Sequence, residues 1–209
     1  MTIFSGHIIQ LIGLVVLLLG SAVYADSWIG PAPTLYVSFD QNFDSSSGNI
    51  KATIKSDSNL QLVQGRHGNA VLVGPEHGFI RYPSVGVLSP DEGSIEFWVK
   101  PLDWDFKEDG FHVFFDARGD GALYLYRYNN DNRLLMMAAE DANEGPYMGN
   151  GKKIRWKKNQ WHHIAGTWSS DGVLLYVDGE PVSDSPLAAR LPTHFNDHFI
   201  IGDLNWGST

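Results

Sequence analysis

The chain has 209 residues, of which 43% are hydrophobic, and this is enough for one domain with a sizeable core. Its formal net charge of −9 argues against nucleic acid and against anionic membrane surfaces as partners. The sequence contains no cysteine, which excludes disulfides, thiolate metal sites and cysteine nucleophiles within it. An acidic domain of this kind suits neutral glycans, cationic surfaces or Ca²⁺ as partners.

The N-terminus has the pattern of a secretory signal peptide. An almost unbroken apolar run over residues 8–20 is followed by small residues at Val23 and Ala25, which favours cleavage after Ala25. The run is shorter than the roughly 20 residues that a membrane-spanning helix needs. No Lys or Arg precedes it, so an uncleaved anchor or a buried helix is the alternative. We predict a signal peptide over residues 1–25 and a secreted product, either extracellular or periplasmic.

Residues 26–34 contain prolines without periodicity and are interpreted as a linker. From residue 35 onward, short β-rich runs are separated by Gly, Asn, Asp and Pro, which is typical of a sandwich or barrel. Residues 94–100 alternate cleanly, as in a strand with one buried face. The predicted strands are residues 35–39, 70–73, 79–82, 94–100, 111–116, 122–128, 133–139, 161–168, 173–177, 180–182 and 199–201. No internal repeat interrupts this series, so residues 35–209 are predicted to form one domain.

Four segments, in the same chain order, resemble motifs of bacterial laminin-G-like domains. They are a G-x-x-G-x-A turn at residues 65–71, an aromatic-W-V-K-P strand at 94–101, a W-H-H-x-A-x-T…L-Y-V-D-G hairpin at 161–179, and an I-G pair at 201–202. The resemblance extends over residues 35–202. It implies an all-β, concanavalin A-like jellyroll, which is a sandwich of two antiparallel sheets.

The resemblance has one gap at the end of the domain. Members of the family close with a strand that reads roughly I-D-E-V-x-I-Y, whereas residues 204–209 read L-N-W-G-S-T. A missing strand leaves unpaired backbone beside the core. We therefore expect that the closing strand is absent from this sequence, or that another element replaces it.

The carboxylates do not show the pattern of a glycosidase. Laminarinase-type relatives place paired acids in E-x-D-x-x-E or E-x-D-x-E, and neither spacing occurs here. Glu96 has Trp98 and Lys100 as its neighbours on the same strand face. The adjacent His162 and His163 point to opposite faces of a strand, so they cannot bind one metal ion together. We predict that the chain is not an enzyme; an atypical glycosidase or lyase is the less favoured alternative.

A structural Ca²⁺ is the one cofactor that the resemblance implies. Matched position by position, its ligands are Asp40 and backbone oxygens of Gly68 and Asn69, with a third contributor in the closing strand. The alternative for Asp40 is a turn residue that bonds to nearby backbone.

Aromatic and amide side chains suggest a glycan site. Tyr124, Tyr126 and Tyr128 share one face of a predicted strand, and Asn130 follows them. Trp104 and Trp156 lie in predicted loops, where exposed rings are costly unless they bind something. These residues are the candidate ligand-binding set: Trp104, Tyr124, Tyr126, Tyr128, Asn130 and Trp156. The alternative is that these aromatics fill the two inner faces of the sandwich.

The sequence as a whole therefore predicts a secreted, non-catalytic, lectin-like module that binds a polysaccharide or glycan. The alternative is a module that binds other extracellular proteins. A basic run at residues 152–158 could pair with anionic sugars, or its lysines could protect an exposed sheet edge.

Overall fold

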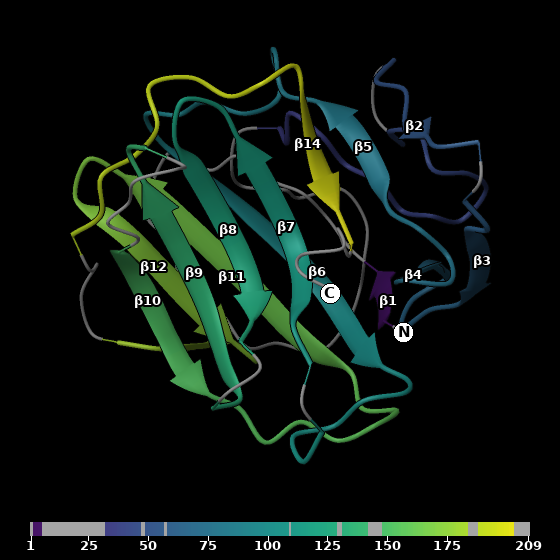
Figure 1. Ribbon diagram of the computed structural model, residues 1–209. Helices are drawn as coiled ribbons and strands as arrows, with labels where there is room; N and C mark the ends of the chain where they lie inside the picture. The colour runs from purple at the N-terminus through teal and green to yellow at the C-terminus, as the bar shows by residue number, and fades with distance from the viewer. Residues whose placement is uncertain are drawn as a thin grey trace.

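The computed structural model describes residues 2–5, 32–46, 49–56, 58–108, 110–128, 131–141, 148–183 and 188–202 (Figure 1). Regular structure in these ranges is β-strand, and none of them contains a helix long and apolar enough to cross a membrane. The apolar run at residues 8–20 and the cleavage position after Ala25 lie outside these ranges. The signal peptide therefore stays a prediction.

Two seven-stranded antiparallel sheets pack face to face. The first sheet has the order β13-β12-β11-β6-β1-β4-β3. Its strands are β13 (Glu180–Pro181), β12 (Gly172–Val177), β11 (His162–Ser169), β6 (Gly93–Pro101), β1 (Thr2–Ser5), β4 (Asn69–Val73) and β3 (Gln61–Gln64). The predicted hairpin is confirmed, because β11 and β12 pair from Ile164 opposite Val177 to Ser169 opposite Gly172.

The second sheet has the order β10-β9-β8-β7-β14-β5-β2. Its strands are β10 (Met148–Lys153), β9 (Arg133–Ala139), β8 (Ala122–Arg127), β7 (His112–Arg118), β14 (His198–Ile201), β5 (Ile80–Pro83) and β2 (Thr53–Ile54). Together the two sheets confirm the predicted all-β jellyroll sandwich. The lysines at 152 and 153 lie on β10, which is an edge strand of this sheet.

The core lies between the sheets and follows the alternation read from the sequence. On β6, Ile95, Phe97 and Val99 point inward, and on β8, Leu123 and Leu125 do the same. A register shift between Val113 and Phe115 of β7 brings two consecutive phenylalanines into the core. Burial of this continuous apolar layer is the main stabilising contribution in a chain without disulfides.

Residues 35–39 do not form the predicted strand. They run extended along the core and keep the expected alternation, with Leu35, Val37 and Phe39 buried. Phe39 has a φ of 60°, which turns the chain out of the extended conformation directly before Asp40. Leu35 alone forms a β-bridge. The pattern therefore predicted burial correctly and a continuous strand wrongly, because side-chain alternation does not determine which backbone groups pair.

The centre of the first sheet holds a strand that the sequence did not predict. β1 lies between β4 and β6 and pairs antiparallel with both (Figure 1). Its residues belong to the predicted signal peptide, so the sheet in this structure is continuous only because that segment is present.

Candidate functional site

One end of the sandwich contains a column of four stacked rings. The ring centroids of His112 and Trp104 are 4.3 Å apart, those of Trp104 and Trp156 are 6.2 Å apart, and those of Trp156 and His162 are 4.3 Å apart. Trp104 and Trp156 are only 3% and 4% exposed and belong to the core. The expectation that both rings are exposed in loops is therefore wrong, because the loops fold inward over the end of the sheets.

Arg127 is buried at this end and forms hydrogen bonds with the residues around the ring column. Its side chain is fully buried, and its guanidinium carbon lies 5.0 Å from the Trp104 ring. The guanidinium donates hydrogen bonds to the backbone oxygens of Gly110 and Glu108 and to the side chain of Asn132. A buried charge requires such partners, so Arg127 has a structural role here.

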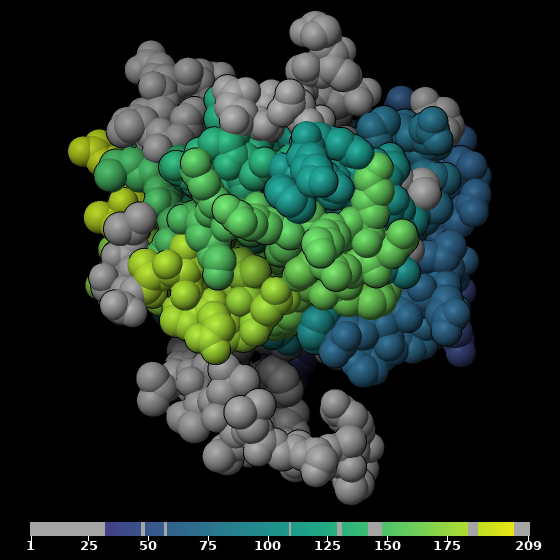
Figure 2. Space-filling model, turned by 90° about the horizontal axis from the view of Figure 1, so that it is seen from below, coloured from purple at the N-terminus to yellow at the C-terminus, as the bar shows by residue number. Residues whose placement is uncertain are grey.

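The loops that cover the ring column also bond to each other. The backbone N–H of Phe106 donates to the Trp156 carbonyl at 2.9 Å, and Lys158 Nζ lies 2.7 Å from Glu108 Oε1. Figure 2 looks onto this end, where the green segment around residues 150–160 lies directly beside the teal segment around residue 105. Burial, followed by the positive charge of Arg127, lowers the pKa of His112 to about 3. This end is a closed aromatic core.

The predicted tyrosine face lies on the outer side of the second sheet. Tyr124 of β8 lies opposite Asp116 of β7. Its side chain is only 4% exposed, and the Arg118 guanidinium carbon lies 5.5 Å from the centre of its ring. Tyr126 stacks on Phe111 at 4.9 Å, and Tyr128 meets the same ring edge-on at 6.3 Å. Of the three tyrosines, only Tyr128 is well exposed. Asn130, the other member of this predicted group, lies outside the described residues.

The same outer face continues across the sheet to a cavity. In register, Tyr124 lies opposite Asp116, Asp116 opposite Ile200, and Ile200 opposite Arg81. Directly opposite residues share a face of the sheet, so Arg81 projects from the same side as Tyr124. Three strand spacings of about 4.8 Å place these two positions about 14 Å apart.

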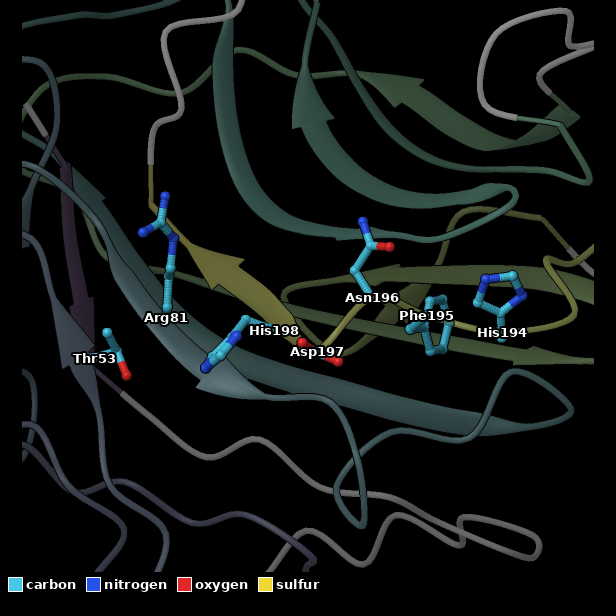
Figure 3. Close-up of a pocket in the computed structure, with 7 residues that line it drawn as sticks. All are labelled: Thr53, Arg81, His194, Phe195, Asn196, Asp197 and His198. Carbon is cyan, nitrogen blue, oxygen red and sulfur yellow. The ribbon is translucent and has the colours of Figure 1, made fainter.

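The cavity has a volume of about 570 Å³ and is formed by three strands and one loop (Figure 3). Its lining residues are Thr53, Arg81, His194, Phe195, Asn196, Asp197 and His198. Figure 3 shows Arg81, His198 and Thr53 grouped on the strands, with Asn196, Phe195 and His194 along the segment that leads into β14. Six of the seven side chains carry hydrogen-bonding groups, and Phe195 adds an apolar ring.

Asp120 fixes the loop that forms one wall of this cavity. It accepts hydrogen bonds from the backbone N–H groups of Thr193 and His194, at 3.0 and 3.2 Å, and from the Thr193 hydroxyl. These hydrogen bonds, with that from the hydroxyl the strongest, lower the pKa of Asp120 to about 2. Gly119 makes the close approach possible, because a Cβ there would lie 1.8 Å from the His194 carbonyl oxygen. The wall is thus held by a carboxylate that stays ionised at neutral pH.

The predicted calcium ligands lie in a turn whose residues form hydrogen bonds with one another. Asn69 donates its backbone N–H to Asp40 Oδ1 at 2.9 Å and its side-chain amide to the Asp40 carbonyl at 2.9 Å. The Gly68 carbonyl accepts a hydrogen bond from Gly65, and a Cβ on Gly68 would lie 2.0 Å from Asp40 Oδ1. Asp40 Oδ1 thus accepts an N–H group within the turn. These hydrogen bonds are the ones that the turn-stabilising alternative requires, and the Ca²⁺ site stays a prediction.

Among the described residues there is no cluster of three or more His, Asp or Glu side chains that could hold a metal ion. His162 and His163 do point to opposite faces: His162 Nδ1 lies 2.9 Å from Asp178 Oδ2, and His163 Nε2 lies 3.6 Å from Glu96 Oε2.

The architecture defines the class of protein as a lectin-type jellyroll. A family model described as the concanavalin A-like lectin/glucanases superfamily matches residues 74–209, which is more than half of the chain. The chain belongs to this superfamily. No curated protein matches it by sequence.

Several solved structures are similar to the chain at low sequence identity. Domain 4 of AbnA, a GH43 extracellular arabinanase from Geobacillus stearothermophilus in complex with arabinotriose, has a TM-score of 0.62 and 21% identity, covering 78% of this chain and 79% of that one. Domains LG4-5 of the mouse laminin α1 chain give a TM-score of 0.47 and 12% identity, covering 63% of this chain and 33% of that one. A galectin from Caenorhabditis elegans gives 0.41 and 14%, covering 64% and 87%. The arabinanase domain supports the sandwich architecture.

Most of the cavity residues were missed by the sequence-based reasoning. Thr53, Arg81 and the 194–198 segment lie far apart in the chain and share no motif spacing. His194 lies in the polar loop before β14, and His198 is the first residue of that strand. Only the strand order, which places β14 beside β5 and β5 beside β2, brings these segments together.

Proposed function

We propose that this chain is an exported, non-catalytic carbohydrate-binding module whose ligand site is the cavity between β2, β5 and the segment leading into β14. The observation that carries the proposal is the composition of this cavity. Its volume lies within the range of small-molecule sites. It combines guanidinium, imidazole, amide, carboxylate and hydroxyl groups with one aromatic ring.

These groups suit a sugar. Arg81 and Asn196 can donate to hydroxyl oxygens, Asp197 can accept from hydroxyl protons, and Phe195 offers an apolar surface to sugar C–H groups. Arg81 is held against the Phe79 ring, with 4.9 Å from the guanidinium carbon to the ring centroid, which limits its freedom before binding. The arabinanase domain of the same fold was solved with arabinotriose, which supports an oligosaccharide as the class of ligand.

The charge arrangement in the cavity supports the proposed absence of catalysis. A retaining glycosidase needs two carboxyl groups about 5–5.5 Å apart. Among the lining residues, Asp197 alone carries a carboxylate. The export part of the proposal depends on the predicted signal peptide.

Binding to arabinotriose and to a panel of insoluble polysaccharides tests the proposal. We expect retention on at least one glycan, and we expect Arg81→Ala and Asp197→Ala each to weaken it about tenfold, the value of one charge-assisted hydrogen bond. The matched controls are Arg66→Ala and Asp171→Ala, two exposed residues that do not line the cavity. They should bind like the wild type.

Two results would contradict the proposal. One is equal loss of binding in the controls and in the cavity variants, which would indicate a nonspecific charge effect. The other is absence of binding to every glycan by a folded, monodisperse protein, which would favour the alternative of a protein-binding module.

A further inference from the structure

The run at residues 152–158 is strongly basic in an acidic chain. It contains five cations and no carboxylate, whereas the whole chain has a formal net charge of −9. Its side chains alternate between solvent and core. Lys153, Arg155 and Lys157 are exposed, while Ile154 and Trp156 are each 4% exposed and belong to the core. We call the three exposed cations the basic row.

The basic row lies on extended chain at the end of β10, an edge strand of the second sheet (Figure 1). At the rise of a strand, side chains two residues apart on one face are separated by about 6.6–6.8 Å. Two hydrogen bonds of 2.9 Å fix this stretch: the Ile154 N–H donates to the Asn132 carbonyl, and the Phe106 N–H donates to the Trp156 carbonyl. The spacing of the row is therefore set before any partner binds.

The carboxylates close to this end of the strand are paired with other cations. Glu108 Oε1 lies 2.7 Å from Lys158 Nζ, and Asp131 Oδ2 lies 3.0 Å from Arg133 Nη2. Within the described parts of the chain, no carboxylate forms an ion pair with a member of the basic row. The row is thus a line of positive charges that an anionic partner could neutralise.

The backbone of this stretch also has groups that point away from the sheet. Opposite residues of an antiparallel ladder alternate between hydrogen-bonded and non-hydrogen-bonded pairs. The Arg133 carbonyl accepts a hydrogen bond from Tyr128, on the side of β8. Lys153 lies opposite Arg133, so its own N–H and C=O point away from β9. Arg155 follows two residues later with the same orientation, and its backbone forms no hydrogen bond with another described residue.

We propose that this edge is a docking site for an acidic peptide segment in extended conformation, with carboxylates at alternate positions. The backbone of Lys153 and Arg155 pairs with the peptide by main-chain hydrogen bonds, as in β-strand addition. Directly opposite side chains share a face of a sheet, so alternate acids meet successive members of the basic row. A peptide is favoured as the partner because its side-chain repeat equals the spacing of the row.

The same cations disfavour pairing with a second copy of this chain. Two basic rows opposite each other would bring like charges together, which is destabilising. The edge therefore selects an acidic strand and rejects its own kind. β10 and β2 are the two opposite edges of the second sheet, so this site is separate from the proposed glycan cavity and does not depend on it.

NMR titration of the full chain with synthetic peptides tests the proposal. One peptide alternates glutamate and threonine, and a second has the same composition with its glutamates contiguous. A third is the alternating peptide with N-methyl groups on its glutamates, which keeps the charge and removes main-chain donors. We expect the alternating peptide to shift the amide signals of Lys153 and Arg155 and to bind at least about threefold more tightly than the other two, a factor within the range of a single net hydrogen bond.

A variant of the row tests the charge contribution. Arg155→Gln should weaken binding of the alternating peptide about threefold, the effect of one exposed ion pair. The matched control is Lys51→Gln, an exposed lysine just before β2 at the opposite edge of the sheet. It should bind like the wild type.

Four results would overturn the proposal. Equal binding of the three peptides would indicate attraction by charge alone. Equal loss in Arg155→Gln and Lys51→Gln would indicate the same. Unchanged amide signals at Lys153 and Arg155 with every peptide would exclude this edge as the site. Shifts produced by polygalacturonate but not by the alternating peptide would instead assign the row to an anionic polysaccharide.

Discussion

Two regions of the molecule contain the same kinds of side chain and have opposite character. The ring column at one end combines Trp104 and Trp156 with two histidines and Arg127, and the cavity combines Phe195 with two histidines and Arg81. In the column the tryptophan rings are buried, the two histidines are half-buried, and the guanidinium bonds to backbone carbonyls. In the cavity the two histidines, Asn196 and Asp197 are exposed, and Arg81 and Phe195 are half-buried.

The course of the loops explains why the column is closed and the cavity is open. The segments around residues 105 and 155 cross over the end of the sandwich and bond to each other, which closes the column. The 193–198 segment is instead held by Asp120 along the outer face of the second sheet, which leaves the cavity open. The presence of aromatic, histidine and arginine side chains thus does not identify a binding site, because loop placement decides whether they stabilise the fold or meet a ligand.

The largest expected effect is on the closed region. Trp156→Ala should lower the free energy of unfolding by about 3–5 kcal/mol, since it removes a buried ring from the core. Denaturant unfolding measures this change. Glycan binding by the fraction that stays folded should match the wild type. A folded Trp156→Ala protein with normal stability that no longer binds glycan would contradict this distinction. It would indicate that Trp156 belongs to the ligand site.

The pH dependence of stability gives the next effect. The pKa of His112 is about 3 in the folded chain and near 6.5 when unfolded, so the unfolded state binds more protons between these values. Stability should therefore fall as the pH drops below about 6.5, by up to about 1.4 kcal/mol per pH unit from this residue.

The variant His112→Phe keeps a ring against Trp104 and removes the titration. Its unfolding free energy, measured between pH 7 and pH 5, should fall by about 2 kcal/mol less than that of the wild type. His67→Phe, at an exposed turn, is the control and should follow the wild type. Identical pH profiles for His112→Phe and the wild type would show that His112 is open to solvent.

The smallest effect is expected at the Asp40 turn, whose polar groups form hydrogen bonds with one another. Asp40→Ala should lower the free energy of unfolding by about 1 kcal/mol through loss of the bond from Asn69. Thermal melting in Ca²⁺ and in chelator should show the same loss, with Asp171→Ala unchanged in both. A loss that occurs only in Ca²⁺ would establish the metal site that the family resemblance implies.

The sequence predicted the strands well where side chains alternate. The β6 run, the β11–β12 hairpin and the burial of Leu35, Val37 and Phe39 follow from one apolar face per strand. Pairing was harder to predict. Residues 35–39 alternate but form no strand and have a β-bridge at Leu35 alone. In contrast, β1, β2, β3 and β10 join sheets without a strong apolar alternation.

The sequence by itself determined the class of fold, because the period of its apolar residues and its turn motifs depend on neighbouring positions. It also determined the placement of the hairpin and the acidic character of the chain. The tertiary structure decided which polar and aromatic residues meet, since Thr53, Arg81 and Asp197 come together only through the strand order, and Trp104 and Trp156 are buried only because two loops close over them. Contacts between distant segments depend on the strand topology, which local side-chain patterns do not determine.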